Sequence, residues 1–142
     1  MTISIDVWSD LLCPFCWIGA RHLELALARC DPGIATLRWR SFQLDPAAER
    51  VSALTNEERL ARKYGRPLAW ARQLHDEITR RGAAVGLRFD FDHVNPTNSF
   101  DAHRLTHLAA SRGLGDAAQL LVRRPTSMTA RSATAHGWLR RQ

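Results

Sequence analysis

Two cysteines near the N-terminus, in the segment SDLLCPFCWIG, carry the clearest chemical signal of the sequence. Cys13 and Cys16 flank Pro14 and Phe15, a spacing typical of dithiol redox pairs and of half of a zinc site. At a helix start, free backbone N–H groups and the helix dipole stabilise a thiolate on the first cysteine. We therefore predict that Cys13 is the exposed nucleophile with a lowered pKa and that Cys16 is the buried resolving thiol. Pro14 stiffens the turn, and the Pro14–Phe15 pair tunes the redox potential.

The pattern around the cysteines predicts the elements that position them. Residues 3–8 alternate between apolar and other side chains, as a strand does. Pro14 suits the first turn of a helix, where its missing N–H costs nothing, and helical spacing continues to about Arg29. Thr36 to Phe42 alternates again. The order strand, helix, strand predicts a parallel, right-handed βαβ unit with the cysteines between the first strand and the helix.

The two cysteines allow two other interpretations. Zinc needs two further ligands, and the only nearby pattern is His103 and His107, which share a helix face but lie far along the chain. We therefore predict no metal and no cofactor. The thiols could also be inert packing residues, although the strand–CPFC–helix context disfavours this. The third cysteine, Cys30, has no neighbouring thiol and is predicted to be a buried packing residue.

The pattern over residues 45–118 predicts a mainly helical segment. A capping box, Thr55 with Glu58, predicts one helix start. A longer helix is expected from Pro67 to the glycines Gly82 and Gly86, followed by a short extended stretch or loop over 87–94. The last helix is expected over 99–111, with Asn98 as its N-cap and Gly113 beyond its end.

Charge and hydropathy narrow the classes of partner. The net charge is +6, but residues 119–142 hold five arginines and no acid, whereas residues 1–118 hold 15 bases and 14 acids. Because the body is not basic, no specific nucleic-acid partner is predicted. No apolar run approaches the ~20 residues that span a membrane, and residues 1–10 lack the pattern of a signal peptide. The expected partner class therefore excludes membranes, and the expected location is the cytoplasm.

Several separated segments carry a resemblance to a known family. IDVWSDLLCPFCWIGARHLELAL and LRWRSFQLDP resemble the DsbA-like thioredoxin domain of the FrnE type, and LARKYG, GLRFDFDHV and NSFDAHRLTHLAASRG resemble its helical insertion. The resemblance covers roughly residues 1–118. It implies an α/β thioredoxin-like fold and dithiol–disulfide oxidoreductase activity, with Cys13 and Cys16 as the redox pair. Related 2-hydroxychromene-2-carboxylate isomerases and kappa-class glutathione transferases typically have serine where Cys13 stands.

The C-terminal part departs from that family's pattern. The fold implies a cis-proline loop, a β-hairpin and a last helix after the insertion, and nothing after Ala118 resembles them. The expected domains are therefore an incomplete thioredoxin domain over 1–118, divided into a βαβ unit over 1–44 and an insertion over 45–118, and a basic, atypical tail over 119–142.

The missing half has expected consequences for activity and association. Residues 3–8 would form an exposed strand edge that invites pairing with a second copy of the chain. Disulfide exchange with protein or small-molecule thiols, including glutathione, would be impaired. The alternatives are a glutathione-dependent isomerase or transferase of the 2-hydroxychromene-2-carboxylate isomerase type, and an inactive fragment.

Overall fold

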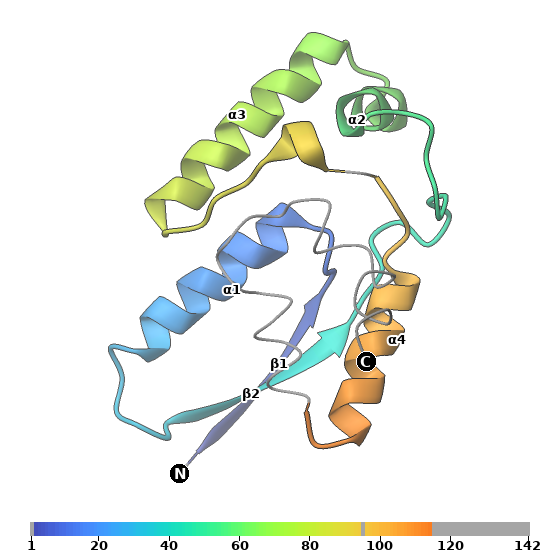
Figure 1. The fold of residues 1–142 in the computed structure, drawn as a ribbon. Helices are drawn as coiled ribbons and strands as arrows, with labels where there is room; N and C mark the ends of the chain where they lie inside the picture. The colour runs from blue at the N-terminus through green and yellow to red at the C-terminus, as the bar shows by residue number, and fades with distance from the viewer. Residues whose placement is uncertain (1, 95, 115–142) are drawn as a thin grey trace.

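A parallel βαβ unit forms the N-terminal part of the structure, a computed structural model that describes residues 2–94 and 96–114. Strand β1 (Ile3–Ser9) leads to helix α1 (Pro14–Leu27) and then to strand β2 (Ala35–Ser41). The strands run parallel, as the sequence predicted, and Ile5 lies opposite Leu37. Helix α1 ends two residues before the expected Arg29, and β2 ends one residue before Phe42. Figure 1 shows both strands pointing toward the end of the molecule where α1 begins.

The two faces of the strand pair differ in polarity. Asp6 on β1 binds Arg40 at 2.8 Å and Arg38 at 3.4 Å across the register, so one face is polar and exposed. On β2 the alternate residues Ala35, Leu37 and Trp39 are half-buried. Within residues 2–94 and 96–114, β1 hydrogen-bonds to β2 alone, and Ile3 is 57% exposed. The other edge of β1 is therefore unpaired within this part of the chain.

The helical segment that follows β2 contains three α-helices and a short 3₁₀ turn. They are α2 (Asn56–Tyr64), α3 (Leu68–Ala84), η1 (Phe91–His93) and α4 (Phe100–Ser111). The predicted capping box at α2 is confirmed: Thr55 accepts the Glu58 N–H, and the Glu58 carboxylate accepts the Thr55 N–H. The N-cap of α4 is Ser99 rather than the predicted Asn98, although the Asn98 side chain still accepts the Phe100 N–H at 2.8 Å.

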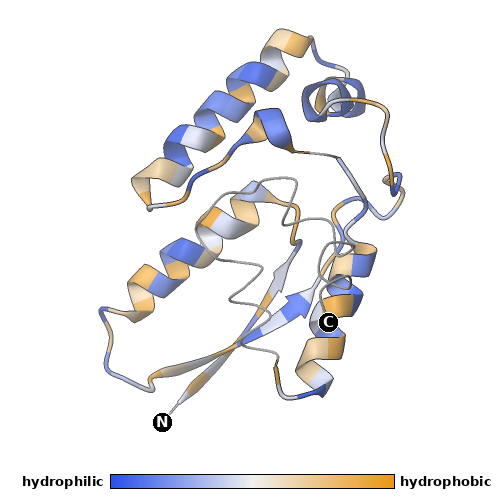
Figure 2. Ribbon diagram, viewed as in Figure 1, coloured by the Kyte–Doolittle hydropathy of each residue, from blue (hydrophilic) through white to orange (hydrophobic). Residues whose placement is uncertain are grey.

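The buried core lies between α1 and α3 rather than over the strands. Ile18 of α1 packs with three residues of α3 and the chain that follows it, namely Ile78, Val85 and Leu87. Gly82 allows Phe89 to approach α3, because a Cβ there would lie 2.5 Å from a ring carbon of Phe89. Figure 2 shows apolar residues alternating with polar ones along α1 and α3, as expected of helices that bury one side.

Helix α4 is tied to the end of β2 by its two histidines. His107 Nε2 lies 2.9 Å from the Ser41 hydroxyl oxygen, and His103 Nε2 lies 3.1 Å from the Phe42 carbonyl oxygen. The predicted common face of His103 and His107 is therefore used for packing against β2. Over the residues that the structure describes, no group of three or more metal-ligating side chains gathers, and no helix combines the length and apolarity needed to cross a membrane.

Candidate functional site

Cys13 occupies the N-cap of α1, immediately after the loop that leaves β1. Its backbone is extended, and Pro14 takes the first helical position, where it needs no N–H acceptor. The Cys13 Sγ atom accepts the N–H of Cys16 at 3.4 Å, and the Cys13 N–H binds the Asp10 carbonyl oxygen at 3.3 Å. Both sulfurs therefore lie in the first turn of α1, as the sequence predicted, and both are free thiols.

The two thiols share a hydrogen bond that separates their ionisation. The bond from Cys13 lowers the pKa of Cys16 to about 6, with further support from the Asp10 N–H and the Ser9 side chain. The same bond, together with burial, raises the pKa of Cys13. The two thiols therefore ionise as a coupled pair that shares one proton when the first negative charge forms. The prediction of a lowered pKa at Cys13 is therefore wrong for the resting dithiol.

Burial of the cysteines also differs from the prediction. Cys13 and Cys16 are both half-buried, rather than one exposed and one buried. Pro14 is half-buried between them, and Phe15 is 45% exposed. Cys30 is exposed beyond the end of α1, where its thiol donates to the Ala26 carbonyl oxygen at 3.4 Å. Its predicted role as a buried packing residue is wrong, because the turn after α1 faces solvent.

A buried carboxylate that sequence reasoning did not single out holds the cysteine loop. Asp10 is 5% exposed and accepts the N–H groups of Leu12 at 3.1 Å and Leu44 at 2.8 Å. Its Oδ1 atom lies 3.7 Å from Nε2 of His103, which is 6% exposed. Burial alone would raise the pKa of Asp10, but His103, these two N–H groups and Ser99 outweigh it and lower the pKa.

Asp10 therefore connects four parts of the chain at one point: the end of β1, the cysteine loop, the segment after β2 and α4. The signal available in the sequence was an acid between Ser9 and two leucines, directly before the Cys-x-x-Cys motif. The partners Leu44 and His103 lie 34 and 93 residues further on, which the local pattern does not reveal. This arrangement fixes the backbone that presents the sulfurs.

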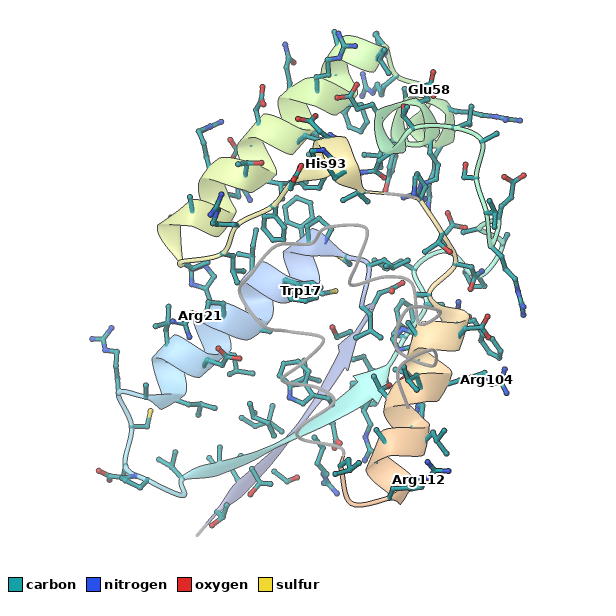
Figure 3. The ribbon with its side chains drawn as sticks, in the orientation of Figure 1. Trp17, Arg21, Glu58, His93, Arg104 and Arg112 are labelled. Atoms are coloured by element: carbon teal, nitrogen blue, oxygen red, sulfur yellow. The ribbon has the colours of Figure 1, made fainter. Side chains whose placement is uncertain are left out.

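Trp17 supports the same loop from α1. Its indole N–H donates to the Leu11 carbonyl oxygen at 2.9 Å, and its ring packs against the buried core. Figure 3 labels Trp17 on α1.

A cavity of about 460 Å³ opens beside Cys13. Its walls come from the cysteine loop, α2, α3, η1 and the start of α4, and they include Cys13, Pro14 and Phe15 but not Cys16. A cavity of this size suits a small ligand or a side chain of a larger one. Of the two sulfurs, Cys13 is therefore the one that a molecule in the cavity meets.

Comparison with known proteins agrees with this geometry. The DSBA-like thioredoxin domain family matches residues 4–129. The chain is 27% identical over 96 residues to the uncharacterized protein YwbO of Bacillus subtilis (strain 168), an alignment that covers 68% of this chain and 42% of that protein. The crystal structure of the probable DsbA oxidoreductase SCO1869 from Streptomyces coelicolor superposes with a TM-score of 0.76 at 32% identity and covers 86% of this chain and 53% of that one.

The chain thus spans about half the length of the relatives it matches. The predicted boundary near Gln119 and the basic tail over 119–142 lie outside the described residues. The division at residues 44 and 45 falls in the connection between β2 and α2.

Proposed function

Because the chain belongs to the DSBA-like thioredoxin domain family, we propose that it is a dithiol–disulfide oxidoreductase in which Cys13 is the nucleophile and Cys16 the resolving thiol. The observation that carries the proposal is the position of the two sulfurs. Cys13 caps α1 and borders the cavity, whereas Cys16 lies behind it and binds it through a hydrogen bond. Pro14 and Phe15 complete the rim beside the attacking sulfur.

In the proposed reaction the Cys13 sulfur attacks one sulfur of a substrate disulfide. The substrate S–S bond breaks, a Cys13 mixed disulfide forms, and the departing thiolate takes up the proton that Cys16 gives up. The Cys16 thiolate then attacks the Cys13 sulfur and releases the second substrate thiol, which leaves a Cys13–Cys16 disulfide. Two electrons pass from the protein dithiol to the substrate, and the reverse sequence oxidises a substrate dithiol. No step needs a cofactor.

The proton that the pair shares is compatible with attack by Cys13. Since the two sulfurs are hydrogen-bonded, the proton passes to Cys16 as Cys13 becomes the nucleophile. Access to the cavity then decides which sulfur reacts. The N–H of Cys16 and the start of α1 stabilise the charge that develops on Cys13.

The experiment is to trap the intermediate with single-cysteine variants of the pair, in a Cys30→Ser background that removes the exposed thiol. We expect Cys16→Ser to accumulate a mixed disulfide with an oxidised peptide substrate, because nothing resolves it. Cys13→Ser should accumulate none, because its remaining sulfur lies outside the cavity. Non-reducing mass spectrometry measures both, and equal trapping by the two variants would contradict the assignment of roles.

Further parts of this proposal concern setting and substrate. We propose the FrnE-type subgroup, a cytoplasmic setting and substrates among protein or small-molecule disulfides, with glutathione as a thiol partner. The Cys13 thiol favours redox exchange over the isomerase or transferase alternative, for which a serine is typical at this position.

A further inference from the structure

The cavity beside Cys13 has an apolar wall and one charged corner. Its apolar lining includes Leu12, Phe15, Leu60, Leu74, Ile78 and Phe91. A bound group that fills this space is therefore an aromatic ring or a branched aliphatic chain.

The charged corner lies on α2 and carries more positive than negative charge. Asp45 is the carboxylate there, and it pairs with Lys63 at 2.8 Å and with Arg59 at 3.5 Å. The other acid on the cavity wall, Asp10, is already bound to the loop and to α4. Burial lowers the pKa of His75, so this residue adds no charge at neutral pH. Two cations therefore share one carboxylate.

Arg59 is the cation with unused hydrogen-bonding capacity. Lys63 lies at close contact distance from Asp45, whereas Arg59 reaches Asp45 and the Asn56 side chain only at 3.5 Å each. Its Nε atom is buried and has no hydrogen-bond partner among the described residues. That atom is closed to a ligand, but the Arg59 side chain is 32% exposed, and its two terminal nitrogens contact Asp45 and Asn56 at 3.5 Å each. These terminal nitrogens carry four N–H donors, which a carboxylate in the cavity can bind at shorter distance.

We propose that this cavity selects disulfides that carry an apolar group beside the sulfur and a carboxylate that Arg59 binds. The inference rests on the proposed function, since the disulfide reacts with Cys13 at one end of the cavity. The apolar group lies between the cysteine loop and α3, and the carboxylate reaches α2. Arg59 thus determines specificity without taking part in the exchange itself.

Two aromatic disulfide reagents separate charge recognition from thiol reactivity. Dithiobis-nitrobenzoate carries a carboxylate on each ring, and dithiodipyridine is neutral at pH values near neutrality. Each accepts two electrons from the dithiol and releases two coloured thiols as the Cys13–Cys16 disulfide forms. The ratio of the two second-order rate constants, measured by stopped flow on the full chain in a Cys30→Ser background, reports preference for the anion.

We expect Arg59→Gln to lower this ratio on the order of tenfold, because a charge-assisted hydrogen bond is lost. Arg62→Gln is the matched control: it removes one charge from the same helix at an exposed position outside the cavity wall, and its ratio should stay within about twofold of the parent. Arg59→Lys keeps the charge and should give a ratio above that of Arg59→Gln, which guards against a variant that fails to fold.

The outcomes distinguish failure of this inference from failure of the proposed function. If dithiodipyridine releases two thiols per chain but the ratio is equal in the parent, Arg59→Gln and Arg59→Lys, the anion site is wrong and the dithiol chemistry stands. An equal fall in Arg62→Gln would attribute the preference to overall charge and also overturn the site. If dithiodipyridine releases no second thiol from the parent, the proposed dithiol function itself fails.

Discussion

Removal of the Asp10 carboxylate tests whether this residue holds the cysteine loop in place. In Asp10→Ala, the Leu12 and Leu44 N–H groups lose their acceptor, and the buried His103 loses its charged neighbour. An unsatisfied buried donor costs about 1–3 kcal/mol, and Asp10 satisfies two backbone donors. Because Leu12 is only half-buried, we expect a total loss of stability near the lower end for two donors, about 3 kcal/mol.

The assay is urea unfolding followed by far-UV circular dichroism, with Asp101→Ala as the matched control. Asp101 pairs with Arg50 and Arg104 at the surface, where its side chain is 46% exposed. An exposed pair contributes about 0–1 kcal/mol, so this variant should unfold close to the parent. If Asp10→Ala and Asp101→Ala unfold at the same urea concentration, the proposed role of the buried carboxylate is refuted.

Acid unfolding tests independently how much the ionised Asp10 carboxylate contributes to stability. The pKa of Asp10 in the folded chain lies below its ordinary value of 3.8. Its ionised form therefore contributes stability above that value, and this contribution is lost as the pH falls through the lowered folded pKa. Asp10→Asn keeps the shape but not the charge, so its stability should depend less on pH below about 4. An unchanged acid profile would show that Asp10 is not stabilised as an anion.

Four further measurements test other features of the structure. The rate of iodoacetamide labelling of the Cys13–Cys16 pair should rise with pH with a midpoint near pH 6. Cys16→Ser should move that midpoint upward, because the hydrogen bond between the two thiols is lost. An unmoved midpoint would contradict a shared proton. Burial lowers the pKa of His75, so the stability that its neutral form contributes is complete above pH 6.5 and declines as the pH falls below that value. His75→Phe should therefore make the melting temperature depend less on pH over that range, and an unchanged pH dependence would contradict this. Gly82→Ala should lower the free energy of unfolding by about 1–3 kcal/mol, because its Cβ would meet Phe89. Gly19→Ala has open space around its Cβ and should leave stability in thermal melts unchanged or increased. Equal effects of the two substitutions would contradict the packing described. If the chain dimerises through β1, Ile3→Lys should shift sedimentation toward the monomer, and an unchanged distribution of species would exclude that edge.

Local sequence determined the elements and the position of the thiols. The alternation in β1 and β2, proline at the first turn of α1 and the Thr55–Glu58 capping box all depend on residues within a few positions of one another. These short-range rules also placed Cys13 and Cys16 at a helix start. Where the prediction concerned a cap that competes with its neighbour, as at Asn98 and Ser99, it was wrong by one residue.

Only the tertiary structure decided the chemistry of the site. The cavity wall beside Cys13 is completed by residues of α2, α3, η1 and α4, none of which lies near the cysteines in the sequence. The contacts of Asp10 with the Leu44 N–H and with His103 join residues from distant parts of the chain. Hydrogen bonding and burial are properties of neighbours in space, so a pattern of spacing in one segment does not contain them.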